Sequence, residues 1–130
     1  MNTKIWIPAG GKAGLAATVA CIGLISGLAS GLFGVGGGIV MVPGMVLLLH
    51  VPIKTAVGTS LAVIIPTAIV GAWKHYHQGN VDWQLALALA PMAILGGYGG
   101  AWLTKVISAG DLKRAFGGVL VLVGLHLIFR

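Results

Sequence analysis

Charged side chains are missing from four long stretches of this sequence, and their absence restricts the fold more than any other feature. No Asp, Glu, Lys or Arg occurs in residues 13–53, 55–73, 83–104 and 115–129. A helix that rises about 1.5 Å per residue needs about 20 apolar residues to cross a bilayer core of about 30 Å. Because lipid offers the backbone no hydrogen-bonding partner, such stretches form either helices or the strands of a closed barrel.

The composition and the local pattern favour helices. Hydrophobic residues make up 58% of the chain and charged residues only 8%, whereas soluble domains carry about 25% charged residues. Barrel strands alternate polar and apolar residues, and the apolar run at residues 45–49 does not alternate. The sequence therefore predicts an all-α polytopic membrane protein with a bundle of four or five transmembrane helices.

The first apolar stretch is about twice the length that one crossing requires, and a glycine-rich segment at residues 34–38 interrupts it. This segment either separates two crossing helices or leads into a re-entrant half-helix. The polar segment 74–80 ends the third span, and a basic loop precedes the last one. We predict a single transmembrane domain over residues 1–130, with spans at about 13–33, 39–51, 55–73, 83–104 and 115–129.

The N-terminal apolar run continues far beyond the core of a signal peptide, so we expect no cleavage there. Cys21, the single cysteine, is expected to pack as a small apolar residue in a helix. The net charge of +6 comes from single basic residues that flank apolar spans. This placement indicates topology signals and not a nucleic-acid surface.

The basic residues predict an orientation only if the glycine-rich segment crosses the membrane. Six of them then lie on one side and two on the other, which favours a cytoplasmic N-terminus in a multi-pass protein of the cell inner or plasma membrane. If the segment is re-entrant, four basic residues lie on each side of the membrane, and the count predicts no orientation. The six are Lys4, Lys12, Lys54, Lys105, Lys113 and Arg114, and the two are Lys74 and Arg130.

Glycines recur every four residues on two of the predicted helices. Gly23, Gly27 and Gly31 place a smooth stripe on the first helix, and Gly96 and Gly100 repeat it on the fourth. Such stripes allow helix backbones to approach closely in lipid. We predict that these five glycines pack helices together.

The glycine-rich segment is the strongest candidate for a binding site. Irregular backbone at membrane depth survives only where protein buries it or where it lines a wet cavity. A helix that restarts near Gly38 directs free N–H groups and a positive dipole end into that cavity, which attracts anions. The alternative is a tight turn at the membrane surface. A dinucleotide site is excluded because Ile39 stands where its fingerprint requires glycine.

Two further groups of polar residues stand out. Thr59 and Ser60 fall in the predicted first turn of the third helix, where their hydroxyls can cap the helix or donate to a ligand. His75 and His77 are interpreted as interfacial loop histidines. With no carboxylate or thiol beside them, we expect no metal site and no cofactor.

Both acidic residues, Asp82 and Asp111, lie in or beside predicted loops. No carboxylate therefore sits within a span, where cation pumps generally place one. Neither a Ser-His-Asp arrangement nor a carboxylate pair indicates catalysis, so we expect no enzyme. A basic protein without buried acids is better suited to anions.

Four motifs resemble the TauE/SafE sulfite-exporter family. They are residues 31–38 with Pro43, residues 54–61, residues 77–82 and residues 112–118, in the order of the family's pattern. The resemblance implies a membrane transporter, or permease, of sulfite, thiosulfate, sulfonates and similar anions. On these motifs we place the substrate at Gly34, Gly36, Gly37, Gly38, Pro43, Gly58, Thr59 and Ser60.

Members of the family are typically about twice this length and contain two similar halves, and this chain resembles one half. Transporter sites commonly lie between two repeats, and one repeat recreates that interface by pairing. We therefore expect a homodimer, with a small anion and lipid as partners and no nucleic acid. The six-to-two charge count predicts a parallel dimer, whereas the four-to-four count would permit an antiparallel one.

Two other classes of protein stay open. One is a small dimeric anion channel, although the Thr-Thr-Phe-Ser type of motif of fluoride channels is missing. The small multidrug-resistance family, which has a similar length, is disfavoured because it requires an acidic residue in its first helix and none is present. The other class is an accessory membrane subunit that transports nothing by itself.

Overall fold

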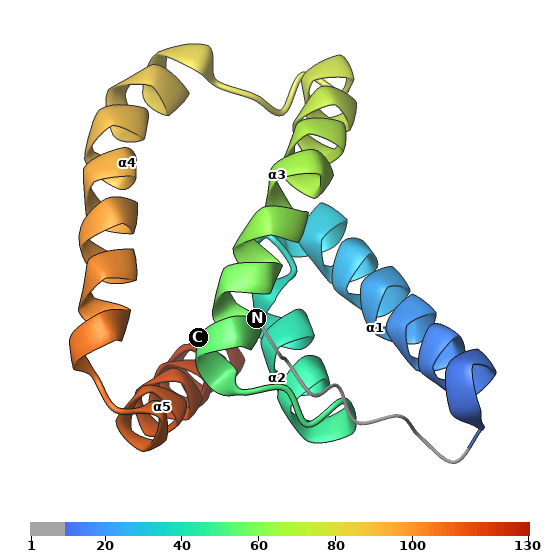
Figure 1. Ribbon diagram of the computed structural model, residues 1–130. Helices are drawn as coiled ribbons and strands as arrows, with labels where there is room; N and C mark the ends of the chain where they lie inside the picture. The colour runs from blue at the N-terminus through green and yellow to red at the C-terminus, as the bar shows by residue number, and fades with distance from the viewer. Residues whose placement is uncertain (1–9) are drawn as a thin grey trace. The chain divides into compact units, whose positions relative to one another are not determined.

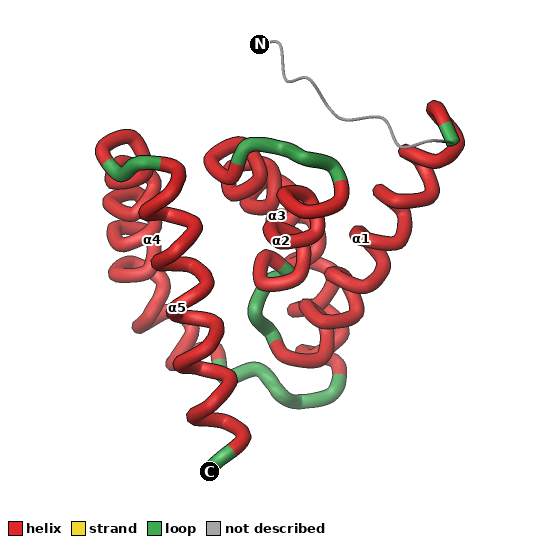
Figure 2. Tube along the Cα trace, turned by 90° about the horizontal axis from the view of Figure 1, so that it is seen from below, coloured by secondary structure: helices red, strands yellow, loops and turns green. Residues whose placement is uncertain are grey.

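The computed structural model describes residues 10–130, and this part of the chain folds into five α-helices without any strand (Figure 1). The predicted all-α membrane fold is confirmed. Lys4, which enters the charge count above, lies outside the described residues. The helices, joined by short connections (Figure 2), are α1 (Gly11–Phe33), α2 (Gly38–Leu48), α3 (Ile53–His77), α4 (Trp83–Val106) and α5 (Ala109–Ile128).

Three of these helices, α1, α3 and α4, are long and apolar enough to cross a membrane. The apolar helix α2 has only 11 residues, so it rises about 16 Å, roughly half the thickness of the bilayer core. The chain is therefore a multi-pass membrane protein that also contains a helix too short to span.

The chain divides into two compact units, one ending at Gln78 and the other beginning at Gly79. In the first unit α1 and α2 run antiparallel, and α3 again runs antiparallel to α2 (Figure 1). The beginnings of α1 and α3 thus lie toward the same end of this unit. The close contact of α1 with α2 uses Gly44, where an added Cβ would lie 3.2 Å from Cγ2 of Ile22. The buried apolar side chains of the unit are Ile22, Met41, Val42, Met45, Leu49, Ile53 and Ala56.

Helix α3 begins earlier than predicted. Pro52 has extended backbone angles (φ −55°, ψ 139°), and its carbonyl accepts the Ala56 amide at 2.9 Å, so the helix starts at Ile53. Thr59 and Ser60 consequently lie in the second turn, and no side chain caps the helix. The capping interpretation of these two hydroxyls is wrong.

Helix α3 also ends later than predicted, at His77. Lys74, His75 and His77 occupy its last turn, where cationic groups interact favourably with the negative end of the helix dipole. The interpretation of His75 and His77 as loop residues is therefore wrong, because the polar segment continues the helix.

The second unit contains α4 and α5, each begun by a side-chain cap. The Asp82 carboxylate accepts the Leu85 amide at 3.0 Å, and the Ser108 hydroxyl accepts the Asp111 amide at 3.2 Å. Because Ser108 caps it, α5 starts at Ala109, and the predicted basic loop before the last span is largely helical. Neither helix contains a buried residue.

Candidate functional site

The chain reverses direction between α1 and α2 through three glycines with positive φ. Gly34 (φ +68°) ends α1 and donates its amide to Ser30 O at 2.9 Å. Gly36 (φ +72°) and Gly37 (φ +73°) follow. Glycine adopts this left-handed backbone without the steric cost that other residues incur. The local sequence thus explains why α1 ends at Phe33 and a new helix starts at Gly38.

This break lies beside the middle of α3. A Cβ added to Gly36 would be 3.2 Å from Cδ1 of Ile64, and one added to Gly38 would be 3.5 Å from the same atom. Ile64 is near the centre of the 25-residue helix α3, which is about 37 Å long. The position favours a reversal at membrane depth over a turn at the membrane surface.

Gly37 packs directly on the backbone of α1. An added Cβ would lie 2.6 Å from the carbonyl oxygen of Ser26 and 3.4 Å from its Cβ. No side chain fits in that space, so both the backbone angle and the close approach require glycine at this position.

Two buried serines flank the break. Ser26 is fully buried at 0% exposure, and within residues 10–130 its Oγ has no hydrogen-bond partner. Ser60 is also buried; it donates its hydroxyl to Val57 O at 2.8 Å, and its Oγ would lie 3.9 Å from a Cβ on Gly38. We call Ser26, Gly37, Gly38 and Ser60 the serine–glycine cluster.

The first turn of α2 adds backbone donors to this cluster. The amides of Val40 and Met41 both donate to Gly37 O, at 3.1 and 2.9 Å. The amides of Gly38 and Ile39 precede these bonds and belong to the helix end that carries a partial positive charge. Hydroxyl and N–H donors are suited to hold an anion.

The structure brings together only some of the predicted substrate residues. Gly36, Gly37, Gly38 and Ser60 meet at the break. Gly34 is an exposed helix end, Pro43 lies in the second turn of α2, and Gly58 is exposed with open space around it.

Sequence reasoning missed Ser26. A serine in an apolar span resembles a small packing residue, and only the contact with Gly37 distinguishes it. Its one available signal is the spacing to Ser30, which places two hydroxyls on one face of a largely apolar helix.

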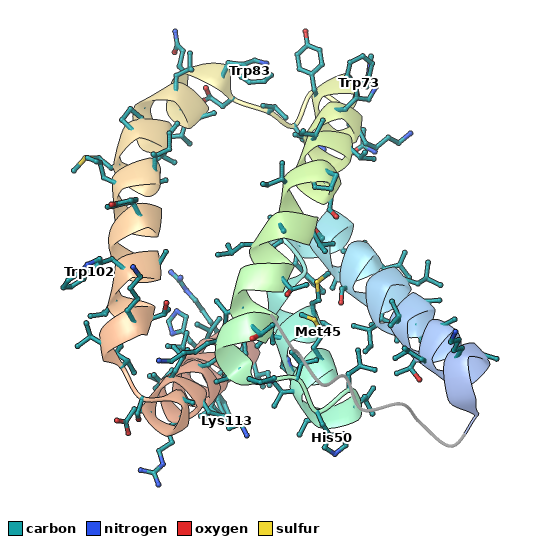
Figure 3. All side chains as sticks on the ribbon, in the orientation of Figure 1. Met45, His50, Trp73, Trp83, Trp102 and Lys113 are labelled. Carbon is teal, nitrogen blue, oxygen red and sulfur yellow. The ribbon has the colours of Figure 1, made fainter. Side chains whose placement is uncertain are left out.

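A cavity of about 370 Å³ lies between α1, α2 and α3. Its walls are mainly apolar and include Ile22, Met41, Met45 and Val63. Thr59, an exposed residue of α3, is also part of the wall, so this predicted substrate residue lies beside the cavity. Figure 3 shows Met45 between the three helices.

The predicted packing glycines have open space around them within the described chain. A Cβ on Gly23, Gly27 or Gly31 meets no atom within 4 Å, and these glycines line a shallow groove on α1. Gly96 and Gly100 on α4 are open in the same way. Their role in helix packing stays a prediction.

These features define a multi-pass helical membrane protein whose first unit contains a glycine-rich reversal between two antiparallel helices. The family described as Sulfite exporter TauE/SafE matches residues 4–129. The chain therefore belongs to the TauE/SafE sulfite-exporter family, as its motifs predicted.

Curated relatives carry the names of membrane transporters. Probable membrane transporter protein YunE of Bacillus subtilis (strain 168) is 39% identical over 109 residues, which are 84% of this chain and 40% of the relative. Probable membrane transporter protein YdhB of the same organism is 36% identical over 104 residues, 80% of this chain and 42% of the relative. The chain thus spans less than half the length of these relatives. No solved structure matches it.

Proposed function

We propose that this chain forms a transporter of small sulfur-containing anions, such as sulfite, thiosulfate or sulfonates, in the plasma membrane. One observation supports this most strongly: α2 begins beside the middle of α3, with the unpartnered hydroxyl of Ser26 packed against it. A membrane-depth site made of N–H and O–H donors stabilises an anion that would otherwise lose its hydration in lipid.

The proposal includes a homodimer. The open glycine stripe on α1 and the unburied surfaces of α4 and α5 leave room for another helical surface to pack on this chain. Transporters of this kind commonly bind their substrate between two related repeats, and a second copy supplies such a repeat.

Flux into proteoliposomes tests the function. Purified protein is reconstituted, and uptake of sulfite, thiosulfate and methanesulfonate is measured against protein-free vesicles. We expect saturable uptake that competing anions reduce. A current that rises with concentration without saturating would indicate an anion channel instead, and the absence of any flux would indicate an accessory subunit.

A further inference from the structure

A groove of about 470 Å³ lies between the C-terminal half of α1 and the C-terminal half of α3. Its walls combine glycine and proline, which carry little side-chain bulk, with the charged side chain of one lysine. None of its lining residues is buried, so the groove is open to the surroundings of the protein. We call it the α1–α3 groove; it is lined by Gly27 and Gly31 of α1 and by Pro66, Thr67, Val70, Gly71 and Lys74 of α3.

Apart from Lys74, the α1–α3 groove presents an apolar surface. The hydroxyl of Thr67 donates to Val63 O within α3 at 2.8 Å, so it needs no further partner. In a bilayer, an open apolar surface is covered either by lipid chains or by another helix.

Lys74 lies at the end of the groove that reaches the membrane surface. It belongs to the last turn of α3, beside Trp73 and Tyr76, which are 68% and 54% exposed. Trp and Tyr gather at the level of the lipid headgroups, and Figure 3 shows Trp73 near this end of α3. Within residues 10–130 the ammonium group of Lys74 has no ion-pair partner.

The length of the groove agrees with the depth of one lipid leaflet. On α3 it extends from Pro66, next to the centre of the helix, to Lys74. These eight residues rise about 12 Å, and half of the hydrocarbon core is about 15 Å thick. An acyl chain that starts at Lys74 therefore has the length to follow the whole groove.

Charge favours a lipid over a second copy of the chain as the molecule that covers the groove. The sequence has eight Lys and Arg residues but only two acidic ones. Asp82 accepts the Leu85 amide and Asp111 accepts the Ser108 hydroxyl, so a second copy offers Lys74 few carboxylates. An anionic phospholipid supplies a phosphate, which lysine binds as a point charge.

We propose that the α1–α3 groove binds one anionic phospholipid. The phosphate lies at Lys74, and one acyl chain extends along Gly71 and Val70 to Pro66. This inference goes beyond the proposed function, because it assigns a lipid site on the outside of the helices and does not depend on which anion the chain transports.

Competition between two lipids tests the headgroup. The full chain is delipidated in mild detergent, and equal amounts of phosphatidylglycerol and phosphatidylcholine with the same acyl chains are added. In native mass spectrometry we expect the first bound lipid to be phosphatidylglycerol about five times as often, which corresponds to about 1 kcal/mol for one lysine near anionic headgroups. Lys74→Gln should remove this preference and Lys74→Arg should keep it. Lys54→Gln, at the other end of α3, is the control and should also keep it.

A variant that fills the groove tests the place of the acyl chain. A Cβ on Gly71 meets no atom within 4 Å, and Gly71→Leu should lower the occupancy of phosphatidylglycerol at least fivefold. The matched control is Ala68→Leu, which enlarges an exposed α3 residue outside the groove. Thermal unfolding of both variants checks that the fold is intact.

Three results would overturn the proposal. One is equal binding of the two lipids, or a preference that Lys74→Gln leaves unchanged. Another is displacement of the lipid by glycerol 1-phosphate, which carries a phosphate without acyl chains and would reveal a site for free anions. The third is a Gly71→Leu protein that loses its dimers but keeps its lipid, since the groove would then hold a second copy. Anion flux enters none of these results, so failure of the proposed function would leave the lipid site standing.

Discussion

The Nε2 atom of His75 lies 2.9 Å from the carbonyl oxygen of Gly31. A carbonyl oxygen only accepts, so Nε2 carries the proton and donates it. Gly31 belongs to the last turn of α1, whose final carbonyls have no partner within the helix. The contact therefore satisfies one of these carbonyls and ties the end of α3 to the end of α1.

Replacement of His75 by leucine should destabilise the protein. The lost hydrogen bond is worth about 0.5–1.5 kcal/mol, and the Gly31 carbonyl loses its partner. Thermal unfolding in nanodiscs measures the effect as a lower Tm. His126→Leu, at an exposed position on α5, is the control and should leave Tm unchanged; equal shifts in both variants would contradict a structural role for the His75 contact.

Gly37→Ala should abolish anion flux. The added methyl group would lie 2.6 Å from the Ser26 carbonyl oxygen in a backbone with φ +73°, so α2 must move away from α1. Flux into proteoliposomes and gel filtration of the same preparation measure activity and folding together. Gly118→Ala, at an open helical position on α5, is the control. Full flux in Gly37→Ala would remove the break from the transport site.

Ser26→Ala should change stability and binding in opposite directions. A buried hydroxyl without a partner costs about 1–3 kcal/mol, so its removal should raise Tm. Loss of a donor to a charged ligand costs about 1.5–3 kcal/mol, which corresponds to at least a tenfold loss of affinity for the proposed anionic substrate. Thermal unfolding and calorimetry measure the two effects.

Ser108→Ala is the matched comparison for Ser26→Ala. It removes the cap of α5 and should lower stability by about 0.5–2 kcal/mol without any effect on anion affinity. If Ser26→Ala weakened folding and left affinity unchanged, the hydroxyl of Ser26 would have a structural role only.

Gly27→Leu should weaken the proposed homodimer. A Cβ at this position meets no atom within 4 Å of the described chain, and a leucine there blocks close approach of a second helix. Because Gly27 also lines the α1–α3 groove beside Pro66 and Val70 of α3, thermal unfolding of the variant checks that its fold is intact. Native mass spectrometry in mild detergent should show dimers for the parent protein and mainly monomers for Gly27→Leu. A strictly monomeric parent protein at every concentration would refute the dimer.

The sequence predicted the parts of the fold that depend on composition and backbone geometry. Missing charges located the apolar helices, and the glycines at 34–38 located the break, because only glycine adopts three left-handed conformations in so short a segment at little cost. The motifs predicted the family. The starts of the helices were less predictable. Helix α3 starts after the extended backbone of Pro52, and α5 starts after the side-chain cap of Ser108. Neither feature identifies one residue in the sequence as the start.

The candidate site was predicted only in part because its members are distant in sequence. Ser26 contacts Gly37 only after α2 has folded back on α1, and the side chains of Ile22, Met41 and Val63 form a cavity wall only when three helices pack. Pro43 and Gly58 belong to the same motifs as residues at the break, but they lie elsewhere in the fold. A motif records which residues occur together, whereas the packing of α1, α2 and α3 decides which of them meet.

The depth at which α2 begins has an electrical consequence. Because this helix begins beside the middle of α3, a monovalent anion bound at its start has crossed about half of the membrane field. One charge that crosses the whole field exchanges about 2.3 kcal/mol per 100 mV, so binding at this depth should change by about 1 kcal/mol per 100 mV. The affinity measured in vesicles should therefore shift about fivefold to sevenfold for each 100 mV, and the membrane potential itself should help to set the occupancy of the site.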